Sequence, residues 1–202
     1  IYWHMVSKLL LSVQETCFSA MQEKAGQAIT EKLVNHYYSI REGIGVHKSP
    51  ELYGAYPTDP YSHTPPGKGA QQPGMTGQVK EDILCRIGEL GIVVENGQIS
   101  FKPTILKLEE FSTIEREIEY FDVQSQKQNI LLPSGSLFFT CCAVPVMYVM
   151  DEQEGMEIFR AGGKTEFYQT AQLSNEDSNA VCERTGELTH IKVLLKSTAL
   201  IG

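Results

Sequence analysis

The fold class is decided by residues 91–101, Gly91-Ile92-Val93-Val94-Glu95-Asn96-Gly97-Gln98-Ile99-Ser100-Phe101, because the spacing of apolar residues changes there. Before Gly91, apolar residues recur every three to four positions, which is the period of an amphipathic helix. After Gly91 the period is two, and Glu95-Asn96-Gly97 contains the Asn-Gly pair that is favoured in two-residue hairpin turns. The stretch therefore predicts helices followed by strands, an α+β arrangement.

Three helices are expected before this switch. The first covers residues 5–21, and the second covers residues 29–40 and ends near Gly43. The third opens near Thr76, a residue type suited to capping a helix, and stops at Gly91. A boundary at this glycine divides the chain into a helical domain, residues 1–92, and a strand-rich domain, residues 93–202.

Strands are expected throughout the second domain. Alternation over residues 114–120 predicts a half-exposed strand, and the nearly continuous apolar run from Leu137 to Met150 predicts one strand buried on both faces. Further short strands are expected at residues 157–159, 165–167 and 190–195. No helix is expected in this half of the chain.

Composition excludes several classes of partner. The 202 residues carry 17 Lys and Arg against 25 Asp and Glu, a formal net charge of −8, which argues against a nucleic-acid or membrane partner. No apolar run reaches the roughly 20 residues that span a bilayer. The five cysteines are odd in number and lack C-x-x-C spacing, which favours reduced thiols and a cytoplasmic location.

A long segment without helical or strand period, residues 46–74, separates the second and third helices. Segments of this length inside a compact protein are often functional, although a linker is the alternative. Tyr56, Tyr61 and His63 lie within it, and aromatic faces with polar tips suit the faces and hydroxyl groups of sugars. The same tyrosines could instead only pack, and His63 could be a solvated loop residue.

The start of the third helix is a candidate anion site. Thr76 and Gly77 place a hydroxyl and free backbone N–H groups at a helix N-terminus, where the dipole favours anions. The alternative is that Thr76 only caps the helix. The five histidines, His4 among them, show no metal-ligand spacing, and no metal or cofactor is expected.

The order of these features resembles the end of the catalytic toroid in cellobiose- and chitobiose-phosphorylase-type enzymes, which are six-hairpin glycosidase-like proteins. The resemblance covers roughly residues 1–111. It rests on the motifs Tyr2-x-His4, Asp59-Pro60-Tyr61-Ser62-His63, Gly67-Lys68-Gly69, Met75-Thr76-Gly77 and Gly97-x-Ile99-x-Phe101-x-Pro103.

The resemblance implies the last helices of an (α/α)6 toroid followed by a small antiparallel, β-sandwich-like domain. It implies phosphate binding by His4, Thr76 and Gly77, and contacts to an oligosaccharide from the loop, by Tyr56, Asp59, Tyr61 and His63. The general acid of the family precedes these motifs, so it is expected upstream of Ile1. This chain would then be a C-terminal part of a longer polypeptide, inactive by itself.

Other classes of protein share this layout. A six-hairpin glycoside hydrolase would have the same architecture without phosphorolysis, and a polysaccharide lyase also combines a toroid with a β-domain. From a different class, the strand-rich domain could be a non-catalytic carbohydrate-binding or structural module. The interpretation therefore is a glycoside phosphorylase or hydrolase fragment, with the binding module as the alternative.

Overall fold

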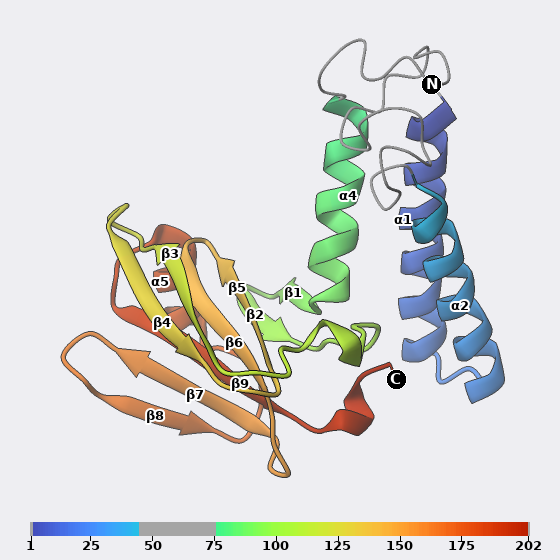
Figure 1. Ribbon diagram of the computed structural model, residues 1–202. Coiled ribbons are helices and arrows are strands. Elements are labelled where there is room, and N and C mark those ends of the chain that lie inside the picture. The colour runs from blue at the N-terminus through green and yellow to red at the C-terminus, as the bar shows by residue number, and fades with distance from the viewer. Residues whose placement is uncertain (1, 45–75, 202) are drawn as a thin grey trace. The chain divides into compact units, whose positions relative to one another are not determined.

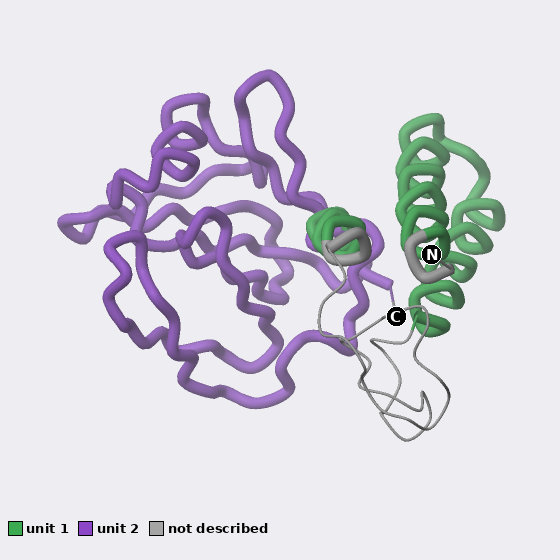
Figure 2. The backbone as a smooth tube through the Cα atoms, turned by 90° about the horizontal axis from the view of Figure 1, so that it is seen from above, with its two compact units in different colours: residues 1–88 green, residues 89–202 purple. Residues whose placement is uncertain are grey.

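The computed structural model describes residues 2–44 and 76–201. The chain divides into two compact units, residues 1–88 and residues 89–202, which are coloured separately in Figure 2. The sequence analysis set its boundary after Ile92, close to this division. Helices in the first unit and mainly strands in the second give the α+β class.

The first unit contains the three helices that the sequence predicts (Figure 1). They are α1 (Tyr2–Gln22), α2 (Gln27–Gly43) and α4 (Thr76–Glu89). Helices α1 and α2 are joined by a short connection and pack against each other, with Leu10 and Cys17 of α1 and Tyr37 of α2 fully buried.

A buried glutamine connects all three helices. The side-chain amide of Gln14 in α1 donates hydrogen bonds to the Tyr37 hydroxyl of α2, at 3.2 Å, and to the Cys85 carbonyl of α4, at 2.7 Å. Gly88 leaves the space for this side chain, because a Cβ at Gly88 would overlap the Gln14 amide. Burial of the polar Gln14 side chain is tolerated because its amide N–H groups are hydrogen-bonded.

The second unit is built on a mixed five-stranded sheet with two smaller hairpins and one helix, α5, Asn175–Glu183 (Figure 1). The sheet order is β5-β6-β9-β7-β8. Its strands are β5 (Ser136–Cys141), β6 (Val144–Met150), β7 (Gly155–Arg160), β8 (Thr165–Tyr168) and β9 (Leu188–Leu195). One hairpin pairs β1 (Ile92–Glu95) with β2 (Gln98–Phe101). The other pairs β3 (Arg116–Phe121) with β4 (Lys127–Leu132).

The expected hairpin at the period switch is confirmed. Strands β1 and β2 pair antiparallel around Asn96 and Gly97, and both turn residues have positive φ, 51° and 77°. These angles belong to the type I′ turn, whose twist matches that of the flanking strands. Gly91, at φ 67°, lies between α4 and β1, where a Cβ would overlap the backbone of Lys102, so only glycine fits there.

Three expectations about the second unit are wrong. The sheet is not purely antiparallel, because β9 returns to the centre of the sheet and pairs parallel with β6. Helix α5 lies in the half for which only strands were expected; Ser174 caps it by accepting a hydrogen bond from the Asp177 backbone N–H. The apolar run from Leu137 to Met150 is two strands, because Cys142 and Ala143 turn the chain between β5 and β6.

The core of the second unit lies on the face of the sheet that α5 and β2 cover. Tyr148 of β6 is fully buried there, and its hydroxyl donates a hydrogen bond to the Leu90 carbonyl. Its ring packs edge-to-face with Phe139, at 5.0 Å between centroids, and with Phe101, at 6.3 Å. This aromatic group joins the first hairpin to the central sheet, and such pairs add about 1 kcal/mol each beyond burial.

The contact between Gln14 and Gly88 predicts the effect of Gly88→Ala. At an unhindered helical site this substitution would stabilise by about 1 kcal/mol. At Gly88 the added methyl group displaces the Gln14 amide and breaks two buried hydrogen bonds, so we expect a net loss of about 1–3 kcal/mol in the free energy of unfolding. Chemical denaturation followed by circular dichroism measures it.

Gly43→Ala is the matched control, because a Cβ at Gly43 meets nothing within 4 Å, and it should not destabilise. Combining Gly88→Ala with Gln14→Ala should cost less than the sum of the two single changes. Strict additivity would contradict the role of Gln14.

Candidate functional site

The sequence-predicted site residues fall into two groups in the structure. Tyr56, Asp59, Tyr61 and His63, the predicted substrate contacts, lie outside the described residues. His4 lies in the first turn of α1, and Thr76 and Gly77 form the start of α4, but the side-chain positions of these three are not among those described.

The backbone of the first unit relates the starts of α1 and α4. The Gln14–Cys85 hydrogen bond ties the two helices together, and in Figure 1 both run in the same direction from their N-terminal ends. His4 precedes Gln14 by ten residues, and Thr76 precedes Cys85 by nine. At 1.5 Å per residue, these positions lie about 15 Å and about 14 Å along their helices from the tie. The first turns of α1 and α4 therefore lie at the same end of the helical unit.

Helix α4 buries its polar face, which the sequence analysis missed. Glu81 and Cys85 are each 3% exposed, whereas the apolar side chains of Ile83 and Ile87 are 55% and 38% exposed. One carboxylate oxygen of Glu81, Oε2, has no hydrogen-bond partner in the described structure.

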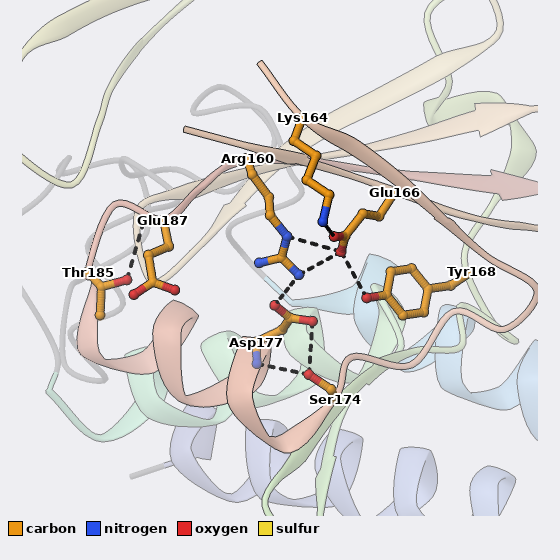
Figure 3. A network of polar contacts seen from close by, with 8 residues as sticks. All are labelled: Arg160, Lys164, Glu166, Tyr168, Ser174, Asp177, Thr185 and Glu187. Carbon is orange, nitrogen blue, oxygen red and sulfur yellow. Dashed lines mark hydrogen bonds and ion pairs between the residues drawn. The ribbon is translucent and has the colours of Figure 1, made fainter. Parts of the chain in front are cut away.

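A network of polar side chains joins the β7–β8 hairpin to α5 (Figure 3). The Arg160 guanidinium of β7 donates to Glu166 Oε2 of β8 at 2.8 and 3.0 Å, and pairs with Asp177 Oδ1 of α5 at 2.7 Å. Lys164 and Tyr168 also bind the Glu166 carboxylate, and the Ser174 hydroxyl donates to Asp177 Oδ2. Every carboxylate oxygen of Glu166 and Asp177 therefore has a partner.

The charges in this network indicate a structural role. The ion-paired group of Arg160, Glu166 and Asp177 is called the clamp below. Hydrogen bonds from Arg160, with a further contribution from Lys164, lower the pKa of Glu166 to about 2. The same Glu166 hydrogen bond raises the pKa of Arg160 above its already high ordinary value. Groups held charged in this way do not exchange protons near neutral pH, so the network fixes α5 against the hairpin and is not an acid–base site.

A cavity of about 270 Å³ opens beside the β3–β4 hairpin. Tyr120 and Gln128 line it from the hairpin and Ala143 from the β5–β6 turn. Gly186 lines it from the segment that follows α5, and Thr189 from the start of β9. Its described lining contains no Lys, Arg or His, but it offers the Tyr120 phenol, the amides of two glutamines, the Thr189 hydroxyl and the Asp122 carboxylate around one aromatic ring. Such a lining suits a small uncharged polar ligand.

One side of this cavity is held by Asp122. Its Oδ1 accepts backbone N–H groups of Gln124 and Gln126 at 2.9 and 2.8 Å, and its Oδ2 accepts the Gln128 amide at 2.9 Å. These hydrogen bonds lower the pKa of Asp122. Partial burial, with the nearby Asp122 charge, raises the pKa of Tyr120, so its hydroxyl stays a donor at neutral pH. A second cavity of similar volume, lined by Phe101, Glu154 and Leu194 among others, lacks such an arrangement around an aromatic ring.

No family model and no curated protein sequence matches the chain. In the part of the chain that the structure describes, no helix has the length and apolar character needed to cross a bilayer.

The lowered pKa of Glu166 predicts how the clamp responds to acid. The native carboxyl group titrates near pH 2 instead of the ordinary 4.5, so the native state retains its charge where the unfolded state is protonated. Its stabilising contribution is complete above about pH 4.5 and is lost as the pH falls toward 2. Glu166→Gln should therefore lower the midpoint of thermal unfolding at pH 7 and flatten its decline between pH 4.5 and 2.

Glu119→Gln is the control for this measurement, because it breaks the exposed pair of Glu119 with Lys127. Exposed pairs contribute less than about 1 kcal/mol. Equal effects of the two substitutions at pH 7 would show that the clamp is no more important than a surface pair.

Proposed function

We propose that this chain is the C-terminal part of a carbohydrate-active enzyme that acts on an oligosaccharide, with inorganic phosphate bound at the N-terminal ends of α1 and α4. In this proposal the three helices are the last of an (α/α) toroid, and the second unit is its β-sandwich-like accessory domain. The upstream part of the same polypeptide supplies the general acid. Without it the chain binds and does not catalyse.

The observation that carries the proposal is the common end of α1 and α4. A helix start offers unpaired backbone N–H groups and a positive dipole end, which favour a phosphate. Because Gln14 ties the parallel helices together, the turn with His4 and the turn with Thr76 and Gly77 belong to one end of the unit. The resemblance of the motifs at these positions to a phosphorylase-type site agrees with that arrangement.

Each proposed residue has a distinct role. The Thr76 hydroxyl and the Gly77 N–H donate to phosphate oxygens, and the His4 ring supplies a further donor from α1. Tyr56, Asp59, Tyr61 and His63, on the intervening segment, contact the sugar. Phosphorolysis and hydrolysis differ in this picture only in whether phosphate or water attacks the anomeric carbon, so phosphate binding distinguishes them.

Phosphate binding by the chain tests the proposal. Isothermal titration with inorganic phosphate should give saturable binding, and Thr76→Val should weaken it about tenfold or more, since hydrogen bonds to charged groups contribute about 1.5–3 kcal/mol. Thr16→Val, the same chemical change at an exposed position of α1, should leave the affinity unchanged. Absence of saturable binding, or equal affinities for the two variants, would overturn phosphorolysis and leave the hydrolase form.

A second candidate function is favoured by the cavity beside the β3–β4 hairpin. In this second proposal the second unit is a non-catalytic carbohydrate-binding module. The sugar lies against Tyr120, and the hydroxyl groups of the sugar bind Gln128 and Thr189. This binding requires no phosphate. It does not depend on the first unit, so the two candidates are separable.

Titration with oligosaccharides, monitored by NMR, tests the module. Tyr120→Phe removes only the phenolic donor and should weaken binding several-fold, because one hydrogen bond is worth about 1 kcal/mol. Phe121→Ala is the control, since Phe121 is the adjacent residue on the strand, is 63% exposed and does not line the cavity. An unchanged affinity in Tyr120→Phe would exclude this cavity as the sugar site.

A further inference from the structure

Asp122 lines the cavity beside the β3–β4 hairpin and keeps one acceptor position open. Its Oδ1 accepts two backbone N–H groups, whereas its Oδ2 accepts only the Gln128 side-chain amide, at 2.9 Å. A carboxylate oxygen has two lone pairs, so Oδ2 can accept a second hydrogen bond. In the described part of the chain, no other hydrogen bond or ion pair to this carboxylate is present.

The Asp122 carboxylate is charged and is not matched by a cation. Its three donors are neutral groups, and their hydrogen bonds, that of the Gln126 backbone foremost, lower its pKa. Lys127, on the strand beside the cavity, pairs instead with Glu119 at 2.7 Å. Because neighbouring residues of a strand point to opposite faces, Lys127 lies on the face away from Gln128. The described lining of the cavity therefore carries one uncompensated negative charge.

The groups around this charge are held in place. Tyr120 and Gln128 are paired across the β3–β4 hairpin, so their side chains lie on the same face, which borders the cavity. The Tyr120 ring packs against Phe138 of β5, with 5.8 Å between the ring centroids. Gly186, also in the lining, leaves room for Gln124, whose side-chain amide a Cβ at Gly186 would overlap. A ring and an acceptor that are already positioned bind a ligand without the cost of ordering them.

We propose that this cavity binds an amino sugar, with the sugar ring against Tyr120 and the ammonium group of the sugar on Asp122 Oδ2. The inference rests on the carbohydrate-binding module proposed above and adds the chemical class of its ligand. The cavity volume of about 270 Å³ lies just below the roughly 300–1,000 Å³ of sites for drug-sized molecules. The cavity therefore holds a monosaccharide or one ring of an oligosaccharide.

An ammonium group supplies what an uncharged sugar lacks. A hydroxyl group can donate one hydrogen bond to Oδ2, but it leaves the charge of Asp122 uncompensated. A protonated amine donates the same hydrogen bond and adds the attraction between opposite charges. A cation beside the Tyr120 ring is also attracted by the face of that ring. Replacing one sugar hydroxyl by an ammonium group should therefore strengthen binding.

Glucosamine and glucose are the probes, because they differ only in the amine or hydroxyl group at one carbon. Titration of the intact chain is monitored by NMR at about pH 6, where the amine is protonated. Glucosamine should bind about three- to tenfold more tightly, as expected for one partly exposed ion pair. The shifted resonances should include those of Tyr120, Gln128 and Thr189, and the difference in affinity should shrink as salt is added.

A pH series tests the charge without any substitution. Tyr120 and Asp122 are the titratable residues of the described lining. The pKa of Tyr120 is raised and that of Asp122 is lowered, so both keep their charge state from about pH 6 to about pH 9. Within the cavity only the ligand loses a proton over this interval. The preference for glucosamine should disappear, and a preference that persists would overturn the ammonium contact.

Asp122→Asn identifies the partner of the ammonium group. The substitution removes the charge at similar size and should bring the affinities for the two sugars to about the same value. Asp151→Asn is the matched control, because Asp151 Oδ1 also accepts a backbone N–H, that of Gln153 at 2.9 Å, outside the described lining of the cavity. It should leave the preference for glucosamine unchanged.

The outcomes separate this inference from the module on which it rests. Equal affinities of the unaltered chain for glucose and glucosamine would overturn the amino sugar and leave a module for uncharged sugars. A preference for glucosamine that survives Asp122→Asn would overturn the role of Asp122. Binding of neither sugar at the cavity would overturn the inference and the module together.

Discussion

The architecture of the second unit depends on neutralising one half-buried charge. Arg160 projects from β7 toward the face that α5 covers, and a guanidinium there must find anionic partners or remain in water. Glu166 and Asp177 provide them from the neighbouring strand and from the helix. Because one partner comes from α5, satisfying this charge also fixes the helix, and with it the start of the segment that borders the cavity.

The arrangement of the helices in the first unit likewise depends on one buried polar group, the uncharged side-chain amide of Gln14. Gln14 is buried on α1, and its amide N–H groups bind one partner on α2 and one on α4. Apolar packing is nondirectional, whereas these hydrogen bonds fix which turns of the helices lie together. The relation between the starts of α1 and α4, on which the phosphate proposal depends, follows from that directionality.

The two proposed sites differ in the ligand that their electrostatics admit. The helix starts favour an anion through backbone donors, even in a chain with net charge −8, because the field at a helix terminus is local. The cavity beside β3–β4 has the Asp122 carboxylate on one side and no described cationic lining, so it disfavours anions. The two proposals thus place a phosphate and a sugar in separate units of one chain.

Periodicity alone determined the elements: the three helices, the Asn-Gly hairpin and most strands follow from local spacing and turn chemistry, which neighbours in sequence establish. It failed where a non-local contact decided. Residues 137–150 look like one strand, but they form β5 and β6, which pair antiparallel across the turn at Cys142 and Ala143. Helix α4 buries the face that carries Glu81 and Cys85, where Gln14 binds the Cys85 carbonyl. The predicted anion-site residues were nameable from the sequence. The clamp and the cavity were not, since their members lie far apart along the chain and only tertiary packing brings them together.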